Sequence, residues 1–244
     1  MKRRIIISEK DIEETAQLLL TGQILLLKIG NTFGLFFNPA IDGLDRKLNI
    51  LKGRTNNQHF SLICNYTQAT KLIDESRINE DFYNIAECLS SIALLRIPLN
   101  TSQPLPFPYN QSENTVQYFS FMEAHPLLRA LQIELERKGC EYFSCTSGNI
   151  HGEPSCRTLD EALILVERLN ARVRELDMFD IQVIVVDIPS LESEYKGSLP
   201  IVSFLNRRQV EVIRYIENDL LATKVLIEKA ITGKKIETTV KYIA

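Results

Sequence analysis

The chain has 244 residues, of which 45% are hydrophobic and 24% are charged, a composition typical of one soluble globular domain. No apolar run reaches 18 residues, so we expect no membrane span, and the net charge of −3 argues against a protein that coats nucleic acid. Five cysteines at irregular spacing, without a C-x-x-C pair, favour a reducing cytoplasm.

Helices and strands alternate in the first part of the chain. Ser8 and Asp11 form a capping-box pattern, and apolar residues then recur at helical spacing until Gly22. A Pro-rich stretch of about sixteen residues, LNTSQPLPFPYNQSEN, is longer than most connections and is typical of a lid or binding loop. In chain order, we expect helices over 12–20, 41–52 and 79–90 and strands over 23–29, 32–38, 59–64, 91–98 and 115–122.

The second part of the chain has the same mixed character. Pro126 begins a helix that Gly139 ends, and Thr158 with Glu161 forms a second capping box. We expect helices over 126–138, 159–176 and 207–231 and strands over 141–145, 180–188 and 199–205. The pattern predicts an α/β domain over 1–205, with a mixed twisted sheet and helices on its faces, and a C-terminal helical extension over 206–244.

Two cations flank a glycine in ILKGRTNN. Lys52 and Arg54 follow the expected helix, and together they could converge on an anion, Arg as a planar fork and Lys as a point charge. A basic turn that complements the helix dipole explains the same residues. The stretch alone does not decide between these two interpretations.

A second polar stretch, YFSCTSGNIHGEPSCRT, lies between a strand and a capped helix. Thr146, Ser147 and Asn149 offer hydroxyl and amide groups, and Gly148 and Gly152 allow the backbone to approach a ligand closely. Ser, Asn and Gly are also the commonest turn formers, so a hydrogen-bonded turn is the alternative.

Several established motifs are absent from the sequence. Neither G-x-x-x-x-G-K nor G-x-G-x-x-G occurs, and the three histidines are not spaced as zinc ligands, so we expect no metal site formed by the protein alone. Cys145 and His151 could form a nucleophile pair, but no third residue is placed to orient the imidazole. The sequence identifies no catalytic residue.

Taken together, these stretches resemble the YrdC/YciO family, which includes threonylcarbamoyl-AMP synthases. TGQILLLKIGNTFGLFFN resembles the family's first strand–turn–strand, ILKGRTNN resembles i-K-g-R-P, and CTSGNIHGEPSCRT resembles S-T-S-A-N-x-S-G-x-P-x-x-T. KGSLPIVSFL and the later VIR resemble S-T-I-V-D and v-l-R. The resemblance covers roughly residues 8–216, and HFSLIC is closer to the YciO branch.

The resemblance implies a deep basic cavity that binds ATP with Mg²⁺. It assigns nucleotide contacts to Lys52, Arg54, Ser147, Asn149, Ser155 and Arg214, and weaker expectations to Thr146, His59 and Gln58. Family members turn ATP, bicarbonate and threonine into threonylcarbamoyl-AMP and pyrophosphate for the threonylcarbamoyl-adenosine modification of tRNA. The expected partners are therefore ATP, bicarbonate, an amino-acid acceptor, and tRNA or double-stranded RNA, in the cytoplasm and without a membrane.

The departures from the family pattern concentrate on the amino-acid side of the site. The family's P-T-E-T is here Lys28-Ile29-Gly30-Asn31, the Arg of v-R-x-P aligns with Phe121, and S-T aligns with Leu199-Pro200, where Ser198 could substitute. A nucleotidyltransferase with a diverged amino-acid pocket and a nucleotide- or RNA-binding protein without catalysis both fit this pattern. The spacing of Ile213, Ile216 and Leu220 also allows a homodimer through the C-terminal helix.

Overall fold

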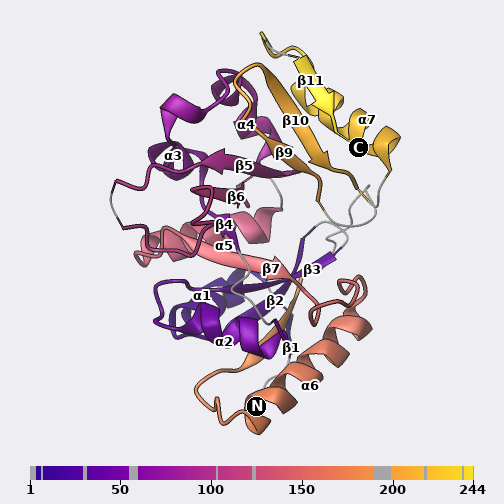
Figure 1. Ribbon diagram of the computed structural model, residues 1–244. Helices are drawn as coiled ribbons and strands as arrows, with labels where there is room; N and C mark the ends of the chain where they lie inside the picture. The colour runs from indigo at the N-terminus through magenta and orange to yellow at the C-terminus, as the bar shows by residue number, and fades with distance from the viewer. Residues whose placement is uncertain are drawn as a thin grey trace.

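A single mixed sheet runs through the molecule (Figure 1). The computed structural model describes residues 4–6, 8–29, 32–54, 60–102, 104–122, 125–188, 199–216, 219–237 and 239–243. Within these residues, eleven strands pair in the order β1-β8-β2-β3-β7-β4-β6-β5-β9-β10-β11. The strands are β1 (Arg4–Ile6), β2 (Ile24–Ile29), β3 (Thr32–Phe37), β4 (Ser61–Ile63), β5 (Leu94–Pro98), β6 (Thr115–Phe119), β7 (Phe143–Ser147), β8 (Val183–Asp187), β9 (Ile201–Ser203), β10 (Gln209–Arg214) and β11 (Thr239–Tyr242).

The sheet combines parallel and antiparallel pairs. β2 is antiparallel to β3 and parallel to β8, and β7 is antiparallel to both β3 and β4. Helices connect many of the strands, and α7 links the parallel neighbours β10 and β11. The helices are α1 (Ile12–Leu20), α2 (Leu44–Leu51), α3 (Tyr66–Lys71), α4 (Phe82–Leu89), α5 (Pro126–Arg137), α6 (Leu159–Glu175) and α7 (Leu220–Ile231). The predicted α/β class with helices on the sheet's faces is confirmed.

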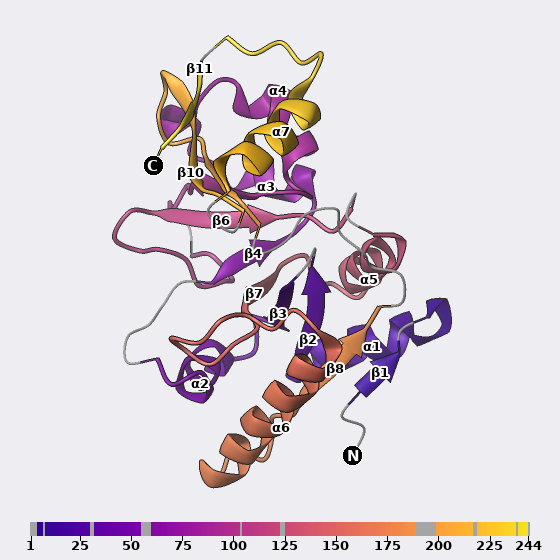
Figure 2. The same ribbon diagram turned by 90° about the vertical axis from the view of Figure 1, so that its right-hand side faces the viewer.

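Helices cover both faces of the sheet around β2 (Figure 2). Successive side chains of a strand point to opposite faces, so Leu25 and Leu27 pack with α1 and α5, whereas Ile24 and Leu26 pack with α2 and α6. All four side chains are fully buried. The apolar run of β2 is therefore buried on both faces, which explains why it lacks the alternation of a half-exposed strand.

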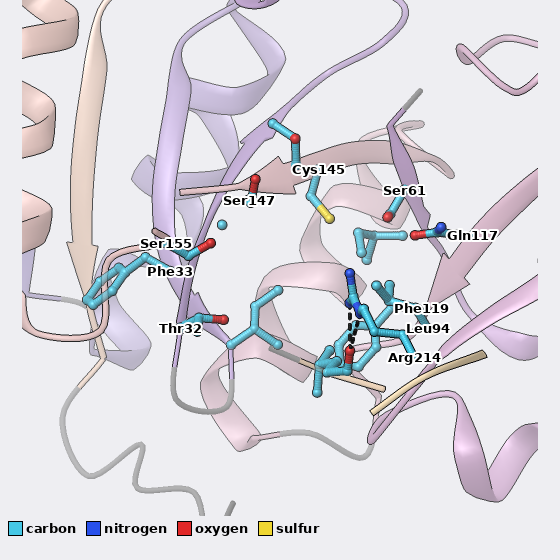
Figure 3. A pocket seen from close by; sticks show the side chains of 15 residues that line it. Thr32, Phe33, Ser61, Leu94, Gln117, Phe119, Cys145, Ser147, Ser155 and Arg214 are labelled. Carbon is cyan, nitrogen blue, oxygen red and sulfur yellow. Dashed lines mark hydrogen bonds between the residues drawn. The ribbon is translucent and has the colours of Figure 1, made fainter. Parts of the chain in front are cut away.

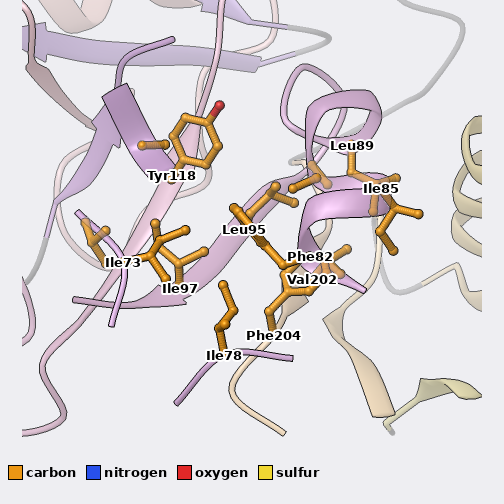
Figure 4. Close-up of a cluster of buried hydrophobic side chains, with 14 of the residues drawn as sticks. Ile73, Ile78, Phe82, Ile85, Leu89, Leu95, Ile97, Tyr118, Val202 and Phe204 are labelled. Atoms are coloured by element: carbon orange, nitrogen blue, oxygen red, sulfur yellow. The ribbon is translucent and has the colours of Figure 1, made fainter. Parts of the chain in front are cut away.

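A further core lies beyond β4, where α3, α4 and α7 pack on the sheet. Phe82 of α4 contacts the ring of Phe204 edge to face, with 5.2 Å between the ring centroids (Figure 4). Val212 of β10 and Ile227 of α7 belong to the same buried cluster. The C-terminal part of the chain therefore shares its core with α4 and β5.

The helix expected over 207–231 is wrong in its first half. Residues Gln209–Arg214 form β10, and the helix begins only at Leu220. Val210 and Val212 are buried while Gln209 and Glu211 are partly exposed, so the period-two alternation of a strand outweighs the helical spacing of the apolar residues. α3 and β11 were not expected either. The boundary after residue 205 and the homodimer stay predictions.

The capping patterns and turns of the sequence form as expected. The Ser8–Asp11 and Thr158–Glu161 capping boxes are both present, and His125 accepts a hydrogen bond from the backbone N–H of Leu127 at the start of α5. None of the described helices combines the length and apolarity that crossing a bilayer requires.

Candidate functional site

A cavity of about 200 Å³ opens where the central strands β3, β7, β4 and β6 meet the ends of β5, β9 and β10 (Figure 3). One side of this cavity carries hydroxyl groups. Thr32 lies on β3, Ser147 ends β7, and Ser155 lies in the loop that follows. Thr146 also lines the cavity. We call Thr32, Thr146, Ser147 and Ser155 the hydroxyl side.

Backbone hydrogen bonds hold the loop after β7 against the first residues of β3. The N–H of Gly148 donates to the carbonyl of Phe33 at 2.8 Å, and the N–H of Phe33 donates to the carbonyl of Cys156 at 2.8 Å. The backbone N–H of Cys156 in turn donates to the carbonyl of Gly148 at 2.9 Å. A Cβ on Gly148 would lie only 2.6 Å from the carbonyl oxygen of Phe33, so this close approach requires glycine.

Lys52 is fully buried and its ammonium group contacts this loop from behind. Nζ donates to Oδ1 of Asn149 at 2.8 Å and also to the carbonyl oxygen of Ser147. The N–H of His151 returns a hydrogen bond to the carbonyl of Lys52 at 2.8 Å. Burial, followed by the positive charge of Arg54, lowers the pKa of Lys52 to about 7. The ammonium is therefore held near its titration point at neutral pH.

Arg54 contacts the same wall one residue earlier on β7, at Thr146. Its Nη2 donates to Oγ1 of Thr146 at 2.7 Å, and its Nη1 donates to Oδ1 of Asn49 at 3.0 Å. The guanidinium carbon lies 5.6 Å from the ring centroid of Phe60, a cation–π distance. Burial lowers the pKa of Arg54, and its Nε is buried without a hydrogen-bond partner.

Arg214 at the end of β10 faces the cavity from the opposite side. Nε and Nη2 donate to the carbonyl of Leu199 at 3.1 and 2.6 Å, as the dashed lines of Figure 3 show. Solvent reaches part of the side chain, yet the protein around the guanidinium desolvates it and lowers its pKa. Arginine remains charged at any physiological pH, so the cavity carries a permanent cation.

The structure places some of the residues predicted for nucleotide contacts in the cavity and others behind it. Ser147, Ser155, Arg214 and Thr146 line the cavity. Lys52, Arg54 and Asn149 are not among its lining residues and lie behind the hydroxyl side. Gln58 and His59, like Gly30 and Ser198, lie outside the described residues. The direct contact of Lys52 and Arg54 with phosphates stays a prediction.

Three polar lining residues were missed from the sequence: Thr32, Ser61 and Gln117. Ser61 of β4 pairs with Gln117 of β6 on one side and with Cys145 of β7 on the other, so adjacent strands place them in one row. A polar side chain inside an otherwise apolar strand was the available signal, because such a residue must face a partner or a cavity. Burial raises the pKa of the Cys145 thiol to about 12, which leaves it protonated and unreactive.

Phe121, which aligns with the family's Arg, does not line the cavity. Its ring is fully buried, 5.5 Å between centroids from both Phe36 and Phe143. Ile29, which aligns with the family's threonine, does line the cavity. The lining residues that the structure describes include no carboxylate and no imidazole, so these residues can bind and orient an anion through Arg214 and the hydroxyl groups.

No protein-family model matches the sequence, and no curated protein matches it. Solved structures do match. P. abyssi Sua5 complexed with L-threonine is 19% identical with a TM-score of 0.63, over 98% of this chain and 65% of that one. E. coli YciO is 11% identical with a TM-score of 0.64, over 91% and 100% of the two chains. Full-length HypF in its phosphate- and nucleotide-bound form is 19% identical with a TM-score of 0.60, over 83% and 24%.

These similarities show that the chain has the YrdC/YciO-like fold: a large, twisted, mixed sheet flanked by helices. The chain spans 65% of the length of the Sua5 chain that it matches. At these identities the likeness establishes the fold alone.

Proposed function

We propose that the chain binds MgATP in this cavity and joins its adenylate to a carbamate made from bicarbonate and an amino acid, as a diverged counterpart of the threonylcarbamoyl-AMP synthases. One observation carries the proposal: Lys52 and Arg54, which follow α2, bond to the same Thr146–Asn149 segment that lines the cavity with Thr146 and Ser147. Hydroxyl donors backed by cations suit phosphate oxygens.

The reaction requires positioning rather than a protein nucleophile. A carbamate oxygen attacks the α-phosphorus of ATP, the new O–P bond forms, and the bond to the bridging oxygen breaks to release pyrophosphate. The attacking group is already an anion, so no proton must be removed at this step. This agrees with a cavity that offers cations and hydroxyls but, among its described lining, no general base.

The donor set fits the triphosphate better than it fits a free metal. The described residues contain no cluster of His, Cys, Asp or Glu that could hold a metal ion. Mg²⁺ would therefore arrive bound to the triphosphate, whose charge it partly neutralises. Ser155 would donate to phosphate oxygens, and Ser147 would do so by exchanging its hydrogen bond to Oδ1 of Asn149. Lys52 and Arg54 would raise the electrostatic potential from behind the wall.

Exchange of labelled pyrophosphate into ATP tests the catalytic proposal. The assay contains bicarbonate and each amino acid of a panel in turn, since the acceptor pocket departs from the threonine pattern. Exchange that requires bicarbonate and one class of amino acid supports the proposal. Complete lack of exchange with every acceptor, from a folded protein that binds ATP, contradicts it.

Binding of a nucleotide or RNA without catalysis is the second candidate. Phe121 occupies the position of the family's Arg and is locked in the core, which removes a carboxylate partner from the acceptor side. The cavity, at about 200 Å³ against roughly 300–1,000 Å³ for most ligand pockets, also leaves little room for a second ligand beside a nucleotide.

Calorimetry with ATP, AMP, a tRNA stem and a double-stranded RNA distinguishes the candidates. Binding without exchange favours this one, and no binding at all excludes both. The tRNA substrate and a cytoplasmic location are part of the proposal through the family resemblance alone.

A further inference from the structure

Five apolar side chains line part of the cavity, beside Thr32 on one strand and beside Ser61 and Gln117 on two others. Ile29, Leu94 and Leu199 are partly buried, and they pack against a core cluster that contains Ile63 and Phe119. All five side chains line the cavity. We call these five residues the apolar wall. They come from β2, β4, β5, β6 and the segment before β9, so the wall is built on the sheet itself.

Arg214 lies beside this wall with part of its guanidinium unused (Figure 3). Nε and Nη2 donate to the carbonyl of Leu199, which belongs to the wall. Among the described residues, no carboxylate pairs with Arg214 and Nη1 has no hydrogen-bond partner. Arg214 is also the one charged residue in the described cavity lining. A cation that has no counter-ion among the described lining can bind the anionic group of a ligand.

We propose that this half of the cavity takes an amino acid with an apolar, branched side chain, its carboxylate on Arg214 and its side chain on the apolar wall. The inference rests on the proposed function and names its acceptor class. A hydroxyl group placed against Ile29 or Leu94 would lose water and find no hydrogen-bond partner in those side chains. A methyl group at the same position would be buried favourably.

Valine and threonine differ only by a methyl in place of a hydroxyl. Comparing their binding therefore shows whether the pocket accepts an apolar or a hydroxyl-bearing side chain. An apolar pocket rejects such a hydroxyl-bearing isostere by about a hundredfold at most. We therefore expect valine to bind roughly tenfold to a hundredfold more tightly than threonine. Ser61 and Gln117 also line the cavity, so glutamine is included as the acceptor that would use their hydrogen bonds.

Ligand-observed NMR titration of the wild-type chain without nucleotide provides the test. The ligands are valine, isoleucine, threonine, glutamine and valinamide, which lacks the carboxylate. We expect valine and isoleucine to bind, and valinamide not to bind. Threonine or glutamine binding as tightly as valine, valinamide binding equal to that of valine, or no binding of any of them each overturns the inference.

Three variants locate the binding. Arg214→Gln should abolish valine binding, whereas Ile29→Thr should raise threonine affinity relative to valine by about tenfold. Arg174→Gln, on the exposed surface of α6, is the matched control and should bind as the wild type does. ATP is titrated separately into the wild-type chain, so absence of valine binding by the wild type with intact ATP binding overturns this inference alone. Loss of ATP binding with intact valine binding overturns the proposed function instead.

Discussion

The ammonium of Lys52 lies 2.8 Å from Oδ1 of Asn149, a side chain 97 residues further along the sequence. Oγ of Ser147 donates to the same Oδ1 at 2.6 Å, and Nδ2 of Asn149 donates to the carbonyl of Glu153. The buried lysine and the polar loop therefore form one hydrogen-bonded unit. The position of the hydroxyl side of the cavity depends on this unit.

The charge of Lys52 should make stability depend on pH. The pKa of Lys52 is about 7 in the folded protein, whereas an ordinary lysine, as in the unfolded chain, has a pKa of 10.5. At a pH between these two values the unfolded chain therefore holds one more proton than the folded protein. The free energy of unfolding should therefore rise with pH above 7, by about 1.5 kcal/mol between pH 7 and 8.5 relative to a chain without this lysine. Urea unfolding of the wild type and of Lys52→Met at several pH values measures the difference.

The buried thiols set the upper limit of the pH range in which the free energy of unfolding rises. Burial raises the pKa of Cys145 and Cys156 to about 12 and about 11, so their deprotonation in the unfolded chain lowers stability once the pH exceeds about 8.5. The wild type and Lys52→Met both contain these thiols, so the contribution of the thiols cancels when the two pH curves are compared. Parallel pH curves for the two proteins would show that Lys52 keeps its ordinary pKa.

Arg54→Lys should weaken ATP binding although it keeps the charge. The shorter, single donor cannot bond to both Thr146 and Asn49, so the hydroxyl side loses a fixed position. One charge-assisted hydrogen bond of about 1.5–3 kcal/mol corresponds to a loss of roughly tenfold to a hundredfold in affinity. Calorimetry measures this loss of affinity, and Arg46→Lys, at an exposed position on α2, is the control. Equal ATP affinities for the wild type and Arg54→Lys would remove Arg54 from the site.

Gly148→Ala should destabilise the protein and displace the loop after β7. The new Cβ would lie 2.6 Å from the carbonyl oxygen of Phe33 and 2.9 Å from Cδ1 of Leu26. We expect a loss of about 1–3 kcal/mol, as for other overpacking changes. Gly152→Ala is the control on the same loop, because it meets no atoms and costs only the strain of its positive φ of 84°. Thermal unfolding of both variants gives the comparison, and a Gly148→Ala protein as stable as the wild type contradicts the close packing.

Restoring the family's arginine at residue 121 should unfold the protein rather than repair the acceptor side. Phe121 is fully enclosed by aromatic rings, so Arg at this position would bury an unpaired charge at a cost above about 4 kcal/mol. Phe121→Leu, which keeps the site apolar, should cost less and leave ATP binding intact. A folded Phe121→Arg protein with improved threonine binding would show that this side chain reaches the cavity.

Removing the residues after Leu205 should unfold the chain rather than release an intact domain. Val210, Val212 and Ile227 are buried in the cluster that also contains Phe82 and Leu95. Truncation would expose these apolar partners, and β9 would lose its antiparallel neighbour β10. Circular dichroism and light scattering of the truncated chain measure the result. A folded truncated monomer would support the predicted boundary at 205.

The sequence predicted elements well wherever local signals agreed. Capping boxes, Gly22 and Gly53 defined the first helices, and the apolar run of β2 defined a strand buried on both faces. The last helix was extended too far because β10 has apolar residues at spacings that suit both a helix and a strand. Only pairing with β9 and β11, which are distant contacts, selects the strand.

The candidate site was predictable in its composition but not in its geometry. The KGR and TSGN stretches indicated Lys52, Arg54 and Ser147 through the family resemblance. Sequence could not show that both cations lie behind the cavity wall, because this follows from how α2 packs beside β7. Ser61 and Gln117 were missed because the row that they share exists only once β4 and β6 pair, and Thr32 was missed as well.

Calorimetric titration of MgATP into the wild-type chain and into Lys52→Met tests the central claim most directly. The account predicts saturable binding by the wild type at concentrations of about 1 mM or below, in the usual range of enzyme substrates, and a loss of at least roughly tenfold in the variant. Absence of binding by the folded wild-type protein, or equal affinity in the two proteins, would contradict it.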